Sequence, residues 1–437
     1  MHDIIIAGGG IAGLTAAYRL RDQNILLLEE KPIPGGRTES RKLGEYVYNA
    51  GAQVIMGDKS PVALLADELG VPRKLINKTK VPLFVNGKLY SANTQPGLLA
   101  KLPLSVMDKV RFAQTAWKIR AQYRSLVGQQ FDPANPNFEE LNVTTMAEFL
   151  GPISPELTTV WNAIATISDG ISIDITTPYH PIMILLHFLE QECAVVGGTH
   201  QLTIALNKSL GDKSQLDAKV TKVEEQEDHI EVTYIKDGTE LTATAKHCVM
   251  AMPAPIVLDL IPALPDWKKA VLKKIDYASQ TSAAFLLRTP SKQWMGEGVW
   301  RVPVAGQLAC AITDPTFMYS QEYRDNNGQG LLRIYTSDLV SKNLIGKDRD
   351  TAIQLLKDDL AEIFPGIEND IIDADIGHWY YANAKWHPGH NKLFAELQAP
   401  TQRIHFCGDY TSAGYMIGSV QSAYRVANEI TDASLMQ

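Results

Sequence analysis

The chain has 437 residues, of which 45% are hydrophobic, and its formal net charge is −8 at pH 7. This length is enough for two domains with a large buried core, whereas the negative charge argues against a nucleic-acid partner, because phosphate binding requires a basic surface. The four cysteines form no C-x-x-C pair and no apolar run approaches the length of a membrane-spanning helix, so we expect no zinc or other metal site, no disulfide framework and no transmembrane segment.

The first predicted elements are a strand, a helix and a second strand. Residues 3–7 form an apolar run typical of a buried parallel strand, residues 11–21 carry apolar side chains at helical spacing, and residues 24–30 form another buried strand. Such a unit of about 30 residues is typical of nucleotide-binding α/β domains. Because the chain runs from Met1 straight into this unit, no export signal is visible, and we expect a cytoplasmic location.

Three glycines between the first strand and the helix form the pattern G-x-G-x-x-G. Gly8 permits the tight turn, Gly10 lets a pyrophosphate approach the backbone, and Gly13 lets helix and strand pack closely. Glu29 ends the second strand, where its carboxylate can accept hydrogen bonds from an adenosine ribose and would repel a 2′-phosphate. The pattern therefore argues against NADP, while NAD and FAD both satisfy it.

A second glycine pair follows Glu29 in the sequence "GGRTES", residues 35–40. Gly36 allows close backbone approach and Arg37 supplies a fixed cation, which is what an extended diphosphate requires.

Between about 76 and 190 the pattern changes to long amphipathic segments. In residues 105–127, apolar side chains fall near one helical face and basic side chains occupy another. The basic face is either solvated in a helical domain or in contact with acidic lipid headgroups at a membrane surface, and the first interpretation is favoured. The apolar positions are Val106, Val110, Ala113, Trp117 and Ala121, and the basic positions are Lys109, Arg111, Lys118, Arg120 and Arg124.

Strand signals return after residue 195. The stretch "VVGGTHQLTIAL" predicts a loop that opens a helix, residues 216–223 predict a strand, and residues 229–245 predict a hairpin that turns at Asp237-Gly238. The stretch "HCVMAMPAP" is typical of a buried strand that ends at prolines. Residues 348–364 predict one capped helix within a region of strands, and the stretch "FCGDYTSAGYMIGSV" from residue 406 is a second glycine-rich segment that opens a helix near Met416.

Several of these motifs together resemble the flavin-dependent amine oxidase superfamily, which includes monoamine and polyamine oxidases, protoporphyrinogen oxidase and the carotenoid and squalene desaturases. The resemblance lies in the spacing E-x5-GGR and in the stretches "EYVYNAGAQVIMG", "VVGGTHQL", "VMAMPAP" and "GYM-x-G-x-V". It implies an α/β fold with a Rossmann-like FAD-binding domain and an interleaved α+β substrate domain that contains a helical subdomain. The expected FAD-binding domain is discontinuous, with residues 1–75, 190–275 and 390–437, and the substrate-binding domain has residues 76–189 and 276–389.

The resemblance also implies how FAD would be held, and from which groups. The amino-terminal glycines with Ala12 and Glu29 would hold the ADP half, Gly36 and Arg37 the diphosphate, and Val220 the adenine through its backbone. Gly51, Ala52 and Gln53 would lie at the ring side, and Gly408 and Asp409 at the ribityl and diphosphate portion. The helix near Met416 would direct its amino terminus at the pyrimidine edge, where its N–H groups favour the anion formed when the ring accepts a hydride.

On the substrate side, the resemblance implies an aromatic cage of Tyr415 and Trp386. Some amine oxidases attach the flavin to a cysteine just before the second aromatic residue, but this chain has Lys385 there, so we expect non-covalent FAD. Many oxidases also carry a lysine that holds a water near flavin N5, and the matching strand here offers Ser282. The sequence therefore leaves open whether oxygen or another molecule accepts the electrons.

Three histidines, His378, His387 and His390, lie near the predicted cage. Pro388 prevents His387 and His390 from lying on one face of a helix, and no carboxylate stands beside them in the sequence. We therefore expect surface or packing roles rather than a metal site. The alternative is an acid–base role for one of the three histidines.

Two functions follow from the resemblance. The first is oxidation of a small amine or amino-acid-derived substrate by hydride transfer from a carbon bonded to nitrogen to flavin N5. The alternative is a desaturase or dehydrogenase that acts on C–C bonds of a lipophilic chain, for which peripheral membrane contact by the basic face would be useful.

Overall fold

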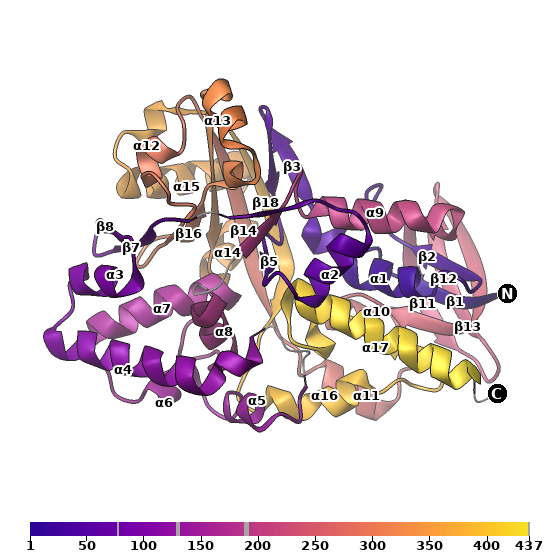
Figure 1. Cartoon of the computed structure of the whole chain (residues 1–437). Coiled ribbons are helices and arrows are strands. Elements are labelled where there is room, and N and C mark those ends of the chain that lie inside the picture. The colour runs from indigo at the N-terminus through magenta and orange to yellow at the C-terminus, as the bar shows by residue number, and fades with distance from the viewer. Residues whose placement is uncertain (77, 128–131, 188–191, 436–437) are drawn as a thin grey trace.

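The structure of the protein is a computed structural model that describes residues 1–76, 78–127, 132–187 and 192–435. Figure 1 shows two sheets side by side, with the chain termini both on the side of the first sheet and a group of helices below the second. Within the described residues, no helix is long and apolar enough to span a membrane.

The first sheet is built from segments far apart in the sequence. Its strands are β10 (Ser214–Gln215), β2 (Ile25–Leu28), β1 (His2–Ala7), β13 (Thr239–Met250), β12 (Ile230–Lys236) and β11 (Ala218–Glu225), in this order, and β19 (Ile404–Phe406) pairs with β13. The central strands β2, β1 and β13 are parallel to one another. Their apolar runs are buried because helices cover the sheet, as continuous apolar strands require.

The helices of this sheet form one apolar layer. α1 (Ile11–Arg19), α9 (His200–Leu210) and α17 (Tyr415–Leu435) pack with their apolar faces against one side of the sheet. The predicted strand–helix–strand unit is confirmed, and so is the hairpin, whose turn residues Asp237 and Gly238 both have positive φ, as a two-residue turn between twisted strands requires.

The second sheet has the strand order β15 (Arg301–Pro303), β16 (Ala309–Thr313), β17 (Gly330–Thr336), β14 (Tyr277–Leu287) and β18 (Ile371–Ala384), all antiparallel. The capped helix predicted in this region is α15 (Arg349–Ile363), which packs on the sheet together with α14 (Asp338–Ile345). All strands of this sheet come from the predicted substrate segment 276–389. The domain boundaries themselves stay predictions, and the one at 189/190 lies outside the described residues.

Smaller elements surround the two sheets. The strand pairs and short sheets are β3 (Ser40–Leu43) with β4 (Tyr46–Asn49), β7 (Val81–Val85) with β8 (Lys88–Ala92), and β5 (Ile55–Met56) and β6 (Arg73–Leu75) on either side of β9 (Glu192–Val195). The remaining longer helices near the first sheet are α2 (Pro61–Glu68), α10 (Ala254–Leu260) and α11 (Asp266–Leu272).

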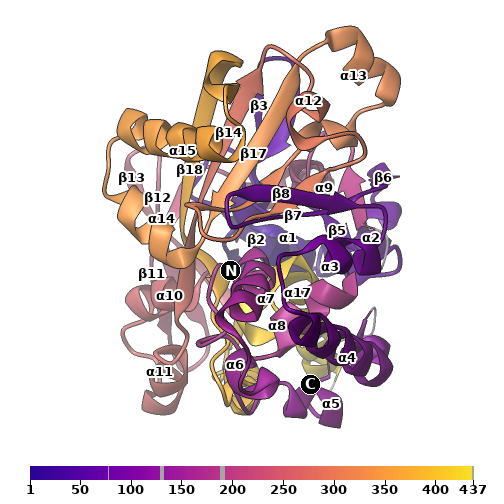
Figure 2. The ribbon, with the colours of Figure 1, turned by 90° about the vertical axis from the view of Figure 1, so that its left-hand side faces the viewer.

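The amphipathic segment forms a group of helices with its own apolar core, seen end-on in Figure 2. These helices are α3 (Gln95–Lys101), α4 (Val106–Tyr123), α5 (Pro136–Glu140), α6 (Met146–Leu150), α7 (Pro155–Asp169) and α8 (Tyr179–His187). The face of α4 that packs inward carries Phe112, Ile119 and Tyr123. The apolar face noted in the sequence, with Val106 and Trp117, points outward and is exposed, because the inward face uses a different set of apolar positions.

Candidate active site

A cavity of about 1260 Å³ extends from the glycine-rich turn after β1 to side chains of the second sheet and of α7 and α8. The predicted residues on its wall are Gly8, Gly10, Ala12, Glu29, Gly36, Arg37, Gly51, Ala52, Gln53, Val220, Gly408, Asp409, Tyr415 and Met416. Of the predicted site residues, Gly13 and Trp386 do not line it. The structure therefore brings the amino-terminal and carboxyl-terminal glycine segments to one cavity.

The glycines after β1 have different structural roles. A Cβ at Gly13 would overlap the Gly8 carbonyl oxygen, whereas a Cβ at Gly10 would meet no atom within 4 Å. Gly13 is therefore needed for close packing of α1, and Gly10 leaves open space at the cavity wall. No side chain caps the first turn of α1, so its N–H groups remain available to an anion. This arrangement fits a bound diphosphate.

Glu29 is fixed on the cavity wall by two backbone hydrogen bonds. Its carboxylate accepts from the N–H of Gly9 at 2.6 Å and from the N–H of Lys31 at 3.0 Å. Burial raises the pKa of Glu29, and the two backbone donors oppose this shift. A carboxylate held in this way has acceptor sites left for ribose hydroxyls, and its role toward a ribose stays a prediction.

Arg37 and Asp409 connect the two ends of the chain at the cavity. Arg37 donates to both carboxylate oxygens of Asp409, at 2.8 and 2.6 Å, and to the carbonyl oxygen of Ala382 at 2.9 Å. Burial lowers the pKa of Arg37, but the adjacent carboxylate outweighs this effect and holds the pKa above its ordinary value. The bidentate geometry fixes both side chains, so residues predicted separately for the diphosphate form one ion pair.

The turn that carries Arg37 is packed against the predicted ring-side segment. The N–H of Ala52 donates to the Arg37 carbonyl oxygen at 2.8 Å, and a Cβ at Gly51 would overlap the same oxygen. Gln53 extends toward the second sheet and donates to the Thr313 hydroxyl at 2.6 Å. Gly51 is therefore required by this packing.

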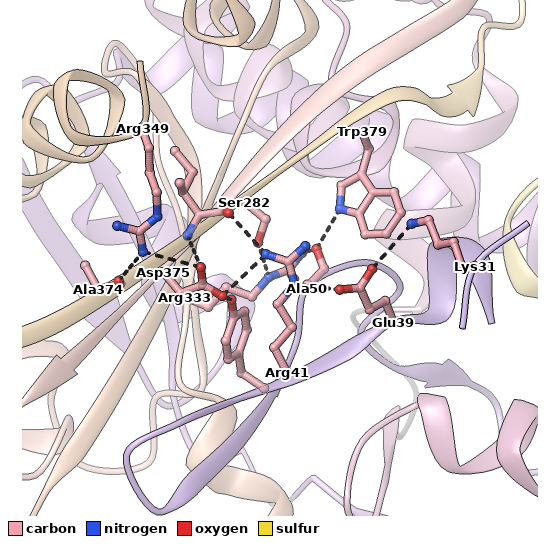
Figure 3. Close-up of polar contacts among 12 residues, drawn as sticks. Lys31, Glu39, Arg41, Ala50, Ser282, Arg333, Arg349, Ala374, Asp375 and Trp379 are labelled. Atoms are coloured by element: carbon pink, nitrogen blue, oxygen red, sulfur yellow. Dashed lines mark hydrogen bonds and ion pairs between the residues drawn. The ribbon is translucent and has the colours of Figure 1, made fainter. Parts of the chain in front are cut away.

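The hydroxyl of Ser282 accepts a hydrogen bond from Arg333, a residue that the sequence did not single out (Figure 3). Arg333 on β17 donates from Nε to Ser282 Oγ at 2.7 Å, and from Nη2 to the carbonyl oxygens of Ala50 at 3.2 Å and Gly51 at 3.1 Å. The Trp379 indole donates to the same Ala50 oxygen at 3.0 Å. Burial lowers the pKa of Arg333 to about 10. A single arginine within the apolar strand "GLLRIYT" was the signal that could have identified it.

Tyr415 belongs to a buried hydrogen-bond network that the sequence did not reveal. Its hydroxyl donates to Asp169 Oδ1 at 2.7 Å, and Asp169 Oδ2 accepts from the Thr176 hydroxyl at 3.0 Å and lies 2.9 Å from His180 Nδ1. Tyr415 also has φ +54°, which is uncommon for a bulky residue. Burial and the Asp169 charge raise the pKa of Tyr415 well above its ordinary value, so the phenol is neutral at physiological pH.

Trp386 does not take the position expected for the second wall of the cage. Its ring is fully buried and stacks between Tyr179 and His390, with centroid distances of 5.0 and 4.9 Å. The ring of His180 contacts both Trp386, at 4.4 Å, and Tyr415, at 4.9 Å. The aromatic cluster therefore holds Trp386 behind His180 rather than on the cavity wall.

The histidines and Lys385 have separate surroundings. His378 lines the cavity and its Nδ1 lies 2.9 Å from the Thr281 hydroxyl, whereas burial lowers the pKa of His390 to about 3. Lys385 forms ion pairs with Asp338 at 2.8 Å and Asp276 at 3.0 Å. No group of three or more potential metal ligands occurs among the described residues.

The sequence model of the family described as "Flavin containing amine oxidoreductase" matches residues 11–431. The chain is 24% identical to the "Probable flavin-containing monoamine oxidase A" of Dictyostelium discoideum, with 100% of this chain and 98% of the relative covered. Its fold is similar to that of wild-type putrescine oxidase bound to putrescine, with a TM-score of 0.81, 19% identity and 99% of each chain covered. It is also similar to cyclohexylamine oxidase from Brevibacterium oxydans IH-35A, with a TM-score of 0.80, 19% identity and 100% of each chain covered. The family match includes Glu29 and Arg37 at one end of the cavity and Tyr415 at the other.

Proposed function

The chain belongs to the flavin containing amine oxidoreductase family, and on this premise we propose that it oxidises a small amine or amino-acid-derived substrate at a carbon bonded to nitrogen, with FAD bound non-covalently. Bound FAD would supply the hydride acceptor for this reaction. The observation that carries the proposal is the continuous cavity from Gly10 and Glu29 to Tyr415. Non-covalent attachment is supported by Lys385, which stands where a cysteine is found in covalent relatives and is held in ion pairs.

The residues of the chain have distinct tasks in this proposal. Glu29 binds the adenosine ribose, and the turn at Gly10 binds the diphosphate through backbone N–H groups. Arg37, neutralised in part by Asp409, adds positive charge near the diphosphate. Tyr415 forms one wall of the substrate region with a neutral phenol and an aromatic face, which suits an uncharged amine poised for oxidation.

The electron acceptor is proposed to be oxygen, as the similarity to proteins named oxidases suggests. Position 282 carries a serine instead of the lysine that holds a water near flavin N5 in many oxidases, and Arg333 donates a hydrogen bond to its hydroxyl. We therefore expect reoxidation by oxygen to be slower than in relatives that carry the lysine. The second candidate function, dehydrogenation of C–C bonds in a lipophilic chain, is favoured by the exposed apolar face of α4. A cytoplasmic location is proposed from the sequence alone.

Anaerobic mixing of the FAD-loaded protein with candidate substrates tests the proposal. We expect saturating primary amines or amino acids to bleach the yellow flavin absorbance completely, whereas polyenes leave it unchanged. Admission of oxygen after bleaching then reports whether oxygen restores the yellow colour. Bleaching by polyenes alone would contradict the amine proposal and support the second candidate.

A further inference from the structure

The part of the cavity wall formed by the second sheet and its neighbouring helices carries several basic side chains. Among the described residues, the second sheet, α7, α8 and α14 contribute no aspartate or glutamate to the cavity wall, although Asp276, directly before β14, also lines it. The basic residues that these elements contribute are Arg301, Arg333, Lys342 and His378. A cation in this wall that has no carboxylate partner would repel an ammonium group and attract an anion.

Arg333 differs from the other cations in this region. Arg301 is paired with Glu192 at 3.0 Å, and Lys342 with Asp338 at 3.0 Å. Arg333 is 2% exposed and forms no ion pair with any described carboxylate. A buried charge without a counter-ion lowers the stability of the folded protein. In this chain such a charge lies at the wall of a ligand cavity.

The hydrogen bonds of Arg333 hold its guanidinium in one orientation. Nε is fixed by Ser282 and Nη2 by the carbonyl oxygens of Ala50 and Gly51, whereas Nη1 makes none of these bonds. Among the described residues, the charge of the group is met by these neutral acceptors and by the ring of Tyr335, whose centroid lies 5.2 Å from Cζ. A planar guanidinium held in this way is pre-organised to bind a carboxylate.

We propose that Arg333 binds an anionic group of the substrate, so that the preferred substrates are amines that carry a carboxylate rather than simple amines or diamines. This inference rests on the proposed function and specifies its substrate class. It also distinguishes the chain from its structural relative that binds putrescine, which carries a second amine instead of an acid.

Binding of benzoate and of benzamide to the FAD-loaded protein tests this inference without turnover. The two probes have nearly the same shape, and only benzoate is charged. We expect benzoate to bind at least about tenfold more tightly, as a charge-assisted hydrogen bond to a buried arginine allows. In Arg333→Met this preference is expected to disappear, with a loss of roughly thirtyfold in benzoate affinity and little change for benzamide. Isothermal titration calorimetry measures both constants.

Arg349→Met is the matched control, because Arg349 is half exposed and lies outside the cavity wall. Arg333→Lys keeps the charge and is expected to restore part of the preference, and circular dichroism checks that each variant folds. Equal affinity of the wild-type protein for both probes, or an equal loss of both in Arg333→Met, would overturn the inference. Oxidation of phenethylamine but not of phenylalanine would also overturn it and leave the proposed function intact, whereas failure of every amine to bleach the flavin would instead contradict that function.

A second, independent observation concerns the outer face of α4. Val106, Val110, Ala113, Trp117 and Ala121 are all exposed and recur every three or four residues, so they form one stripe along the helix. Val106 is 80% exposed and Trp117 is 73% exposed. Because the opposite face already packs into the helical core, this stripe is not needed for folding.

Basic side chains lie along both margins of this stripe. At the helical period of 3.6 residues, Lys109 and Arg120 lie on one side and Arg111 and Lys118 on the other. These four cations are concentrated on one helix of a chain whose net charge is −8. An apolar stripe with basic margins matches the boundary between acyl chains and anionic headgroups in a bilayer.

We infer that the α4 stripe docks in the plane of an anionic lipid surface. Sedimentation with vesicles of phosphatidylcholine that contain phosphatidylserine, compared with phosphatidylcholine alone, tests this. Binding to the anionic vesicles is expected to fall about tenfold in Trp117→Ala and in the double variant Lys118→Gln/Arg120→Gln. Trp267→Ala is the matched control, since Trp267 is an exposed tryptophan on α11. Protein that stays in the supernatant, or a dimer that dissociates on Trp117→Ala in light scattering, would overturn the inference.

Discussion

Replacing Gly10 with valine is expected to give a folded protein that no longer binds FAD. A Cβ at this position meets no atom within 4 Å, and the residue lies on the cavity wall at the start of α1. The valine Cβ would therefore meet no protein atom, and its side chain would extend into the space proposed for the diphosphate. The affinity for FAD is expected to fall by roughly a thousandfold, or about 4 kcal/mol, because the cofactor and the side chain exclude each other.

Fluorescence titration of the FAD-free protein with FAD measures this loss. Thermal unfolding of Gly10→Val should coincide with that of the FAD-free wild-type protein, since only the stabilisation by ligand binding is lost. Gly13→Val provides the contrast, because its Cβ would overlap the Gly8 carbonyl oxygen and separate α1 from β1. That variant is expected to be destabilised by about 3 kcal/mol or more even without FAD. Normal FAD binding by Gly10→Val would show that the diphosphate lies elsewhere.

That the amino-terminal glycines and Glu29 share one cavity wall was predictable because their sequence signals are local. Gly8, Gly10 and Glu29 fall within one strand–helix–strand unit, where spacing alone fixes the backbone geometry. Arg37 and Asp409 were each predicted beside the diphosphate, from separate motifs. That they form an ion pair with each other could not be predicted, because the pairing depends on how distant segments fold together.

The substrate half was predicted less well, for the same physical reason. Arg333 and Asp169 belong to a strand and a helix whose sequences indicate only secondary structure, and their partners come from remote segments. Trp386 was selected from the family resemblance, yet stacking against Tyr179 and His390 holds it off the cavity wall. The outward face of α4 was likewise hidden, since the sequence shows that a helix is amphipathic but not which of two apolar faces packs inward.

Removal of the Asp169 carboxylate is expected to destabilise the protein and to release Tyr415. Asp169 is 1% exposed and its two oxygens hold Tyr415, Thr176 and His180 together. In Asp169→Ala these buried polar groups lose their common partner, which is expected to lower the free energy of unfolding by about 3 kcal/mol. Urea denaturation of the FAD-loaded protein measures this change.

Asp169→Asn keeps the volume of the side chain. It therefore distinguishes a role of Asp169 in positioning Tyr415 from a general effect on stability. The amide offers only one acceptor oxygen, so the variant cannot serve all three of its neighbours. We expect Tyr415→Phe to lower the free energy of unfolding by about 1 kcal/mol in the wild-type background and by much less in Asp169→Asn. The same double-mutant cycle on kcat/KM for the best amine should be non-additive, because both changes free the same ring. Additive effects on kcat/KM would show that Asp169 does not act through Tyr415, and would assign the carboxylate a purely structural role beside His180.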